Sequence, residues 1–120
     1  MDSSISQEDI RRISDILLKS WSLESSSRWL EENPACGQCG VTALVINDIF
    51  GGEILKTNIL GVWHFYNRID DNRYDFTVSQ FSEMPKYVDV LSSREEAFTD
   101  TSEAQYENLK SKVMTHWLER

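Results

Sequence analysis

Residues 36–52 read Cys-Gly-Gln-Cys-Gly-Val-Thr-Ala-Leu-Val-Ile-Asn-Asp-Ile-Phe-Gly-Gly, and this stretch decides the fold. Its apolar residues leave little polar face, which predicts a largely buried helix from position 38 or 39 to position 50. The Gly51–Gly52 pair ends this helix, as a C-terminal glycine commonly does. Pro34 prevents a continuous helix from entering it from the preceding segment. The sequence therefore predicts a buried helix with Cys39 at its N-terminus.

Capping residues and apolar periodicity predict the remaining elements. Besides the buried helix, we expect helices over residues 7–19 and 92–98 and a last helix opened by a capping box at Ser102–Gln105. Strands are expected over residues 53–60, 62–69 and 73–79, with a possible short edge strand at Tyr87–Val88. This order predicts an α+β fold in which N-terminal helices pack on a small antiparallel β-meander, followed by a C-terminal helix. We expect residues 1–120 to form a single domain.

Composition limits the classes of function. The chain has 120 residues, of which 40% are hydrophobic and 27% charged, as is usual for globular proteins. Its formal net charge of −8 repels phosphate backbones, so we expect no nucleic acid partner. The N-terminus lacks the basic and apolar regions of a secretory signal, and no apolar run is long enough for a membrane span. The sequence thus predicts a cytoplasmic protein without a membrane partner and leaves its oligomeric state open.

Cys39 and His64 carry the main functional signal. The positive end of a helix dipole favours a thiolate, and a histidine from a neighbouring sheet is the usual base for such a thiol. His64 lies on an expected strand and is the only histidine outside the last expected helix. Gly37 and Gly40 give a substrate backbone room to approach, while Gln38 and the first amides of the helix can donate to an oxyanion. An inert, buried structural cysteine is the competing interpretation.

Asp75 is the natural residue to orient the imidazole. However, a two-residue turn at positions 71 and 72 places Asp75 opposite Arg68 and Ser79 opposite His64. In that register Asp75 lies about 13 Å from His64 along the strand. A cross-strand ion pair between Arg68 and Asp75 is therefore an equal alternative. A bulge could close the gap, or Ser79 or Gln80 could orient the imidazole instead.

Two other chemistries compete for the same cysteine. Cys36 and Cys39 form a CxxC motif at a helix start, which is typical of thiol–disulfide exchange. The polar segment before the motif argues against that interpretation, because a thioredoxin-type site follows a buried strand. A zinc site built from the two cysteines with His64 and His116 matches no standard spacing. We therefore expect neither a metal nor a cofactor.

Four segments together resemble the YunG family of small bacterial proteins: residues 33–35, residues 37–55, His64–Ile69 and Tyr74–Phe81. The resemblance runs from about Trp21 to residues 105–106 and implies no known activity. The order of a helix Cys, a strand His and a following polar residue also resembles papain-like folds such as NlpC-type peptidases, transglutaminases and arylamine acetyltransferases. That resemblance implies a papain-like core with Cys39 as nucleophile, His64 as base and Asp75 as orienting residue. Asp75 follows His64 by 11 positions, a shorter interval than is usual in transglutaminase-like enzymes.

The sequence thus predicts a cysteine-dependent hydrolase or acyl transferase acting on a small-molecule or peptide substrate. One alternative is a non-catalytic module that binds a protein or peptide on the same scaffold. Its contact surface would be aromatic and would comprise Trp63, Phe65, Tyr66 and Phe76. Thiol–disulfide exchange is the third hypothesis.

Overall fold

The computed structural model describes residues 5–119, and within them an α+β fold forms as predicted. In chain order the elements are α1 (Gln7–Ser20), α2 (Cys39–Phe50), β1 (Glu53–Ile59), β2 (Val62–Ile69), β3 (Asn72–Tyr74), the short 3-10 helix η1 (Val78–Gln80), β4 (Val90–Leu91), α3 (Arg94–Phe98) and α4 (Glu103–Trp117). The predictions of α1, α2, β1, β2 and α4 are confirmed to within one or two residues. The expected edge strand lies a little later in the chain, at β4.

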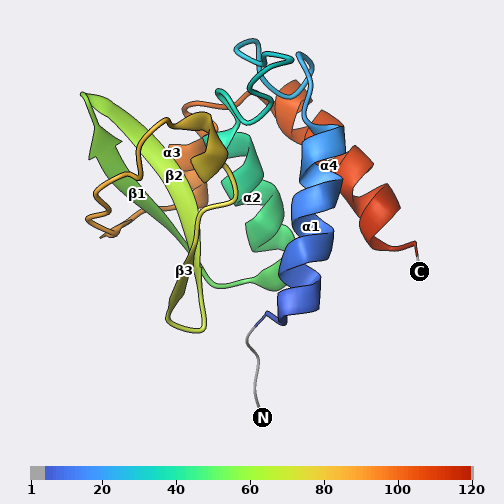
Figure 1. Cartoon of the computed structure of the whole chain (residues 1–120), viewed down its shortest axis with the longest axis horizontal. Coiled ribbons are helices and arrows are strands. Elements are labelled where there is room, and N and C mark those ends of the chain that lie inside the picture. Colours follow the sequence, from blue (N-terminus) through green and yellow to red (C-terminus); the bar gives the residue numbers. More distant parts are fainter. Residues whose placement is uncertain (1–4, 120) are drawn as a thin grey trace.

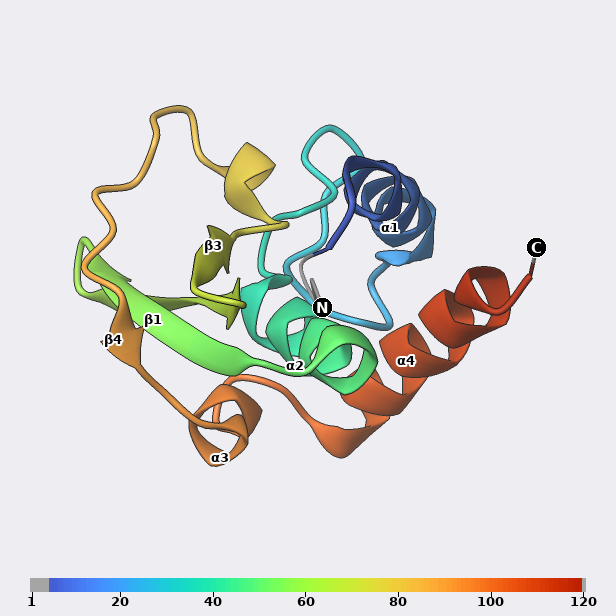
Figure 2. The same ribbon diagram turned by 90° about the horizontal axis from the view of Figure 1, so that it is seen from below.

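The buried helix α2 lies between the sheet and the helices α1 and α4 (Figures 1 and 2). The sheet is antiparallel and has the strand order β3-β2-β1-β4. Every residue from Cys39 to Ile46 is buried, because an almost wholly apolar helix must be covered on all sides. Figure 2 shows the long segment between η1 and β4 arching on the side of the sheet away from α2.

The turn between β2 and β3 differs from the prediction. Ile69 pairs with Asn72, so Asp70 and Asp71 form the two-residue connection, and both have positive φ angles, 51° and 67°. Positive φ at both central residues is characteristic of the turn that fits the twist of a β-hairpin. The register is consequently shifted by two residues from the expected one. The strand also ends at Tyr74 rather than continuing to residue 79.

Arg12 joins the first helix to the last. Its guanidinium lies 4.3 Å from the centre of the Trp117 ring and donates hydrogen bonds to the carbonyl groups of His116, Trp117 and Glu119. Carbonyls at a helix C-terminus lack intrahelical donors, and an arginine there satisfies them and complements the helix dipole. This contact holds α1 and α4 together on the side of α2 opposite the sheet.

None of the helices formed by residues 5–119 combines the length and the apolar character required to cross a bilayer.

Candidate functional site

Cys39 and His64 border the same cavity, although they come from different layers of the fold. Cys39 is the first residue of α2 and His64 lies near the start of β2. Both are buried, with 7% and 3% of their surface exposed. The cavity has a volume of about 330 Å³. A buried thiol and a buried imidazole therefore meet at a space that can hold a small ligand.

His64 forms a close pair with Asp75. The distance from His64 Nε2 to Asp75 Oδ2 is 2.7 Å, and the Asp75 side chain is 4% exposed. Burial alone disfavours the imidazolium, but hydrogen bonds to Asp75 and to Cys39 outweigh it and raise the pKa of His64 to about 9. Because Asp75 takes Nε2, Nδ1 is the nitrogen left for the thiol. His64 is thus held as a cation near neutral pH, between a carboxylate and a sulfur.

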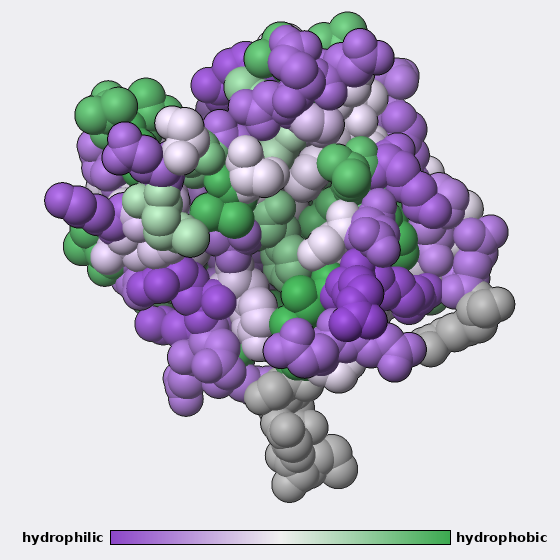
Figure 3. All heavy atoms as spheres, in the orientation of Figure 1, coloured by the Kyte–Doolittle hydropathy of each residue, from purple (hydrophilic) through white to green (hydrophobic). Residues whose placement is uncertain are grey.

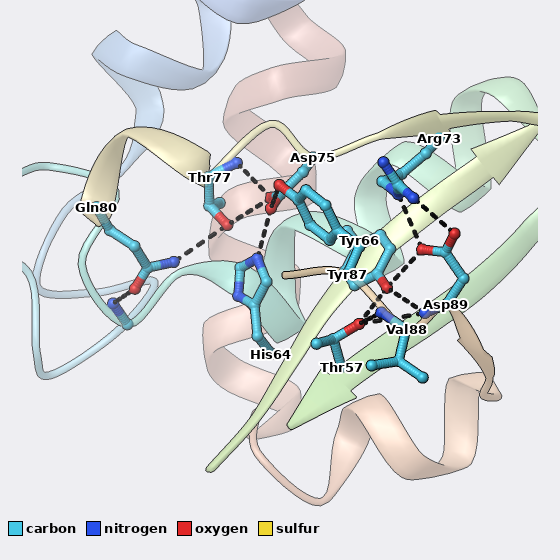
Figure 4. A network of polar contacts seen from close by, with 11 residues as sticks. Thr57, His64, Tyr66, Arg73, Asp75, Thr77, Gln80, Tyr87, Val88 and Asp89 are labelled. Atoms are coloured by element: carbon cyan, nitrogen blue, oxygen red, sulfur yellow. Dashed lines mark hydrogen bonds and ion pairs between the residues drawn. The ribbon is translucent and has the colours of Figure 1, made fainter. Parts of the chain in front are cut away.

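Asp75 reaches His64 because the chain leaves the sheet after Tyr74. Asp75 Oδ1 accepts hydrogen bonds from the backbone N–H and the hydroxyl of Thr77, at 3.2 and 3.3 Å (Figure 4). A bond from an aspartate to the amide two residues on is an Asx turn, which competes with strand pairing. The shifted register removes about half of the 13 Å gap, because continued pairing would place Asp75 opposite Tyr66, two residues from His64. The turn then brings the carboxylate to the imidazole. The alternative Arg68–Asp75 ion pair is wrong, since Arg68 pairs with Glu53 at 2.8 Å.

Tyr87 supplies a further donor to the same carboxylate. Its hydroxyl lies 2.7 Å from Asp75 Oδ2, the oxygen that also contacts His64 (Figure 4). Burial and this hydrogen bond raise the pKa of Tyr87 far above its usual value, so the hydroxyl stays protonated and donates. Asp75 therefore accepts bonds from three residues, Thr77, Tyr87 and His64. These three partners fix the orientation of the carboxylate.

The segment that carries Tyr87 is itself fastened to the sheet through Asp89. Arg73 binds the Asp89 carboxylate with two hydrogen bonds of 2.8 and 2.7 Å, and Tyr66 donates to it at 2.8 Å. The hydroxyl of Thr57 accepts from the backbone N–H of Val88 at 2.9 Å (Figure 4). These bonds hold the loop between η1 and β4 over the sheet face that bears His64.

Gln38 does not reach the cavity. Its side chain is fully buried, accepts a 2.8 Å hydrogen bond from Ser25 Oγ and donates to the carbonyl of Ser22 at 3.4 Å. It fastens the connection between α1 and α2, so its amide is occupied and the expected oxyanion contact from this side chain does not form. Ser79 is exposed on η1 and does not border the cavity. With the strand ending at Tyr74, Ser79 does not pair with His64 as the expected register required.

Gln80 does border the cavity and links its two sides. Its Oε1 accepts from the backbone N–H of Gly37 at 3.4 Å, and its Nε2 donates to Thr77 Oγ1 at 3.2 Å (Figure 4). Gln80 therefore acts on Asp75 through Thr77, and its two side-chain hydrogen bonds go to Gly37 and Thr77 rather than to the imidazole. Gly37 has a φ of 74°, and a Cβ there would lie 2.6 Å from Arg28 Cβ, so only glycine fits.

Gly40 has a packing role rather than the expected role of admitting a substrate. It is buried, and a Cβ at this position would lie 3.0 Å from Thr101 Oγ1 and 3.3 Å from the carbonyl oxygen of Ala97. The glycine lets the first turn of α2 approach the segment that joins α3 to α4. Of the two glycines near Cys39, Gly37 borders the cavity and Gly40 does not.

The remaining candidates lie apart from this site. Cys36 is half-buried, is a free thiol like Cys39, and does not border the cavity. His116 lies near the end of α4, where its Nδ1 is 3.3 Å from Glu119. Within residues 5–119, no three histidine, cysteine or acidic side chains are grouped closely enough to hold a metal ion. Of the four residues considered for a zinc site, Cys39 and His64 border the same cavity, whereas Cys36 and His116 do not.

Sequence reasoning missed four residues of the site. Thr77 and Tyr87 hold Asp75, while Arg28 and Asp100 border the cavity and form an ion pair of 3.6 Å. Only Thr77 had a local signal, because Asp-x-Thr is a common Asx-turn sequence. Tyr87, Arg28 and Asp100 are brought to the site by tertiary packing, which no nearby pattern reveals.

The aromatic surface expected for a binding module is mostly interior. Phe65 and Tyr66 are 4% and 1% exposed, and Phe76 packs partly buried against the core. Of the four residues, Trp63 alone is well exposed, at 43%. These four side chains therefore do not form the exposed contact surface that the binding-module hypothesis predicted.

The chain is thus an α+β protein in which a thiol and an imidazole border one cavity and a buried carboxylate binds the imidazole. Comparison with known proteins adds the family: the model described as "YunG protein" matches residues 9–118. The chain is also 56% identical over 101 residues to the "Uncharacterized protein YunG" of Bacillus subtilis (strain 168), covering 84% of this chain and 88% of that protein. The chain belongs to the YunG family. No solved structure matches it.

Proposed function

We propose that the protein is a cysteine-dependent acyl transferase or hydrolase with a papain-like core. The observation that carries the proposal is that His64, held 2.7 Å from Asp75, borders the same cavity as Cys39. A cationic imidazole and a helix N-terminus both favour the thiolate, which is the nucleophilic form of cysteine. In this proposal Cys39 is the nucleophile, His64 the acid and base, and Asp75 the residue that orients the imidazole.

The reaction follows from these roles. The Cys39 thiolate attacks the carbonyl carbon of an ester, thioester or amide, and a C–S bond forms while the carbonyl oxygen becomes an oxyanion. Backbone N–H groups in the first turn of α2, which have no intrahelical acceptors, are suited to stabilise that oxyanion. His64 then donates its proton to the leaving group as the original C–O, C–S or C–N bond breaks. An S-acyl cysteine remains.

The second half returns the site to its starting state. Water or another nucleophile attacks the acyl carbon, and His64 accepts its proton. The C–S bond then breaks, releasing the carboxylic acid or the transferred acyl product and the Cys39 thiolate. Asp75 keeps Nδ1 of the imidazole directed at the sulfur throughout.

Selective alkylation tests the proposal. Iodoacetamide at pH 7 should modify Cys39 at least about tenfold faster than Cys36, as peptide mapping by mass spectrometry would measure. His64→Ala should remove most of that difference. His116→Ala is the matched control, because this histidine lies outside the cavity, and Cys36→Ser should leave the Cys39 rate unchanged. Equally slow labelling of both cysteines in the parent protein would refute the proposal.

A non-catalytic binding module is the second candidate, and the exposed end of the β1–β2 hairpin favours it. Leu60 is 99% exposed and Val62 is 60% exposed beside the same cavity. Such a module would bind ligands in the cavity without forming an S-acyl adduct. Intact-mass measurement after incubation with p-nitrophenyl esters separates the two, because only the enzyme gains an acyl group on Cys39. Thiol–disulfide exchange, the third hypothesis, would instead show a loss of two hydrogens shared by Cys36 and Cys39 on oxidation.

A further inference from the structure

The wall of the cavity beside Cys39 is mainly apolar. Its apolar side chains come from the end of the β1–β2 hairpin and from the residue after η1, and they are Ile59, Leu60, Val62, Trp63 and Phe81. Phe81 also packs edge-on against the His64 ring, with 4.8 Å between ring centres. An apolar group placed next to the reacting sulfur would therefore contact the side chains that also enclose the imidazole.

The charged groups of the wall neutralise each other. Arg28 and Asp100 both border the cavity and pair at 3.6 Å, so neither is a free charge for a ligand of opposite sign. The third charged group of the wall, the imidazolium of His64, is paired with Asp75 at 2.7 Å. The chain as a whole carries a formal charge of −8, which opposes the approach of an anion. The wall therefore offers little to hold a carboxylate, phosphate or ammonium group close to Cys39.

A second cavity lies beside the first. A neighbouring cavity of about 510 Å³ shares Ile59, Leu60 and Phe81 with the first and extends along residues 82–86. Figure 3 shows an apolar group of side chains at the upper left, over the hairpin end of the sheet. Exposed apolar side chains grouped beside a cavity are typical of a ligand-binding surface. A group larger than acetyl has room to extend from the site along this path.

We infer that the Cys39 site takes acyl donors whose acyl part is uncharged and apolar, an aliphatic chain of several carbons or an aromatic ring, seated against Leu60, Trp63 and Phe81. This inference rests on the proposed function for the identity of the nucleophile. It adds the chemical class of the group that the nucleophile receives. Small hydrophilic acyl groups such as acetyl fill little of the wall, and anionic ones such as succinyl meet, in the wall beside Cys39, only cations that are already paired, Arg28 with Asp100 and His64 with Asp75.

A series of alkylating reagents tests this inference separately from catalysis. We would measure the rates of Cys39 modification by iodoacetamide, N-benzyliodoacetamide, N-hexyliodoacetamide and iodoacetate. Each rate is divided by the rate at which the same reagent alkylates the thiol of glutathione. The benzyl and hexyl reagents should exceed iodoacetamide by about tenfold, which partial burial of such groups provides. Iodoacetate should be slower than iodoacetamide. Equal normalised rates for all four reagents, or a preference for iodoacetate, would overturn the inference.

Variants of the wall identify where the preference arises. Leu60→Asn should reduce the benzyl and hexyl preference severalfold without unfolding the protein, because Leu60 is 99% exposed and has a φ of 52°, which asparagine tolerates. Leu23→Asn is the matched control, since Leu23 is 61% exposed and does not border the cavity. An identical preference in both variants would place the apolar contact elsewhere and refute the inference.

The two proposals fail in different ways. If Cys39 reacts fast with iodoacetamide in a His64-dependent manner but shows no apolar preference, the proposed function stands and the acyl class is wrong. If the apolar preference is present but Cys39 reacts no faster than Cys36, the cavity binds apolar groups and the enzymatic proposal is wrong.

Discussion

Asp75 Oδ2 lies 2.7 Å from His64 Nε2 although Asp75 lies beyond the last residue of β3 that pairs with β2. The Asx turn with Thr77 places it there, and the Tyr87 hydroxyl holds the same oxygen from the opposite loop. A turn, a loop and a strand thus converge on one carboxylate. The position of the imidazole depends on contacts from all three segments.

Asp75→Asn should lower the pKa of His64. Burial alone opposes the imidazolium, and the hydrogen bond and charge of Asp75 are the main effects that offset burial and bring the pKa to about 9. Without the carboxylate only Cys39 opposes the effect of burial, and the pKa should fall well below 9. An NMR titration of the histidine ring signals, assigned with His116→Ala, measures this. A His64 signal that still titrates near 9 in Asp75→Asn would show that Asp75 does not control it.

The His64 pair should also make stability depend on pH. The folded pKa of about 9 exceeds the unfolded value of 6.5, so the stabilisation is fully present below pH 6.5 and is lost as pH rises through 9. A difference of this size corresponds to roughly 3 kcal/mol. Urea unfolding at several pH values should show the loss in the parent protein and in His116→Ala. If His64→Gln loses the same amount of stability over this pH range, the loss arises from other titrating groups.

Tyr87→Phe should destabilise the protein by about 1–3 kcal/mol, because it removes a hydrogen bond to a buried, charged acceptor. The ring contacts remain available, since Tyr87 lies 5.0 Å from the Tyr66 ring and 4.2 Å from the Arg73 guanidinium. Urea unfolding measures the change. Tyr74→Phe is the matched control, because the Tyr74 hydroxyl takes no part in the bonds that hold Asp75. Equal changes in the two variants would mean that the Tyr87–Asp75 bond contributes nothing specific.

Sequence reasoning gave α2 and the β1–β2 hairpin within one or two residues because their signals are local. Apolar residues predominate along α2 until Gly51, and β-branched and aromatic residues predominate in β2. The candidate pair of Cys39 and His64 followed from the same signals, since a helix N-terminus and a strand were each recognisable. Element boundaries were sufficient to nominate these two residues.

The third residue could not be derived in the same way. The alternation of residues 73–79 fits a strand, but the Asp75 carboxylate binds the Thr77 amide and the chain turns away from the sheet. The turn at Asp70 and Asp71 also shifted the register by two residues from the expected one. Tyr87 approaches from a loop 12 residues further along, and only the folded chain brings it to Asp75.

Gly37→Ala should destabilise the fold and slow alkylation of Cys39. Gly37 has a φ of 74°, and an added Cβ would lie 2.6 Å from Arg28 Cβ and 2.7 Å from Ser26 Oγ, so the segment before the site must shift. Gly61→Ala is the matched control, because Gly61 also has positive φ, 88°, but a Cβ there meets nothing within 4 Å. Gly61→Ala should cost about 1–2 kcal/mol of backbone strain, measured by urea unfolding, and Gly37→Ala should cost more. Equal losses of stability with unchanged Cys39 reactivity would show that the close approach of Gly37 to Arg28 does not shape the cavity.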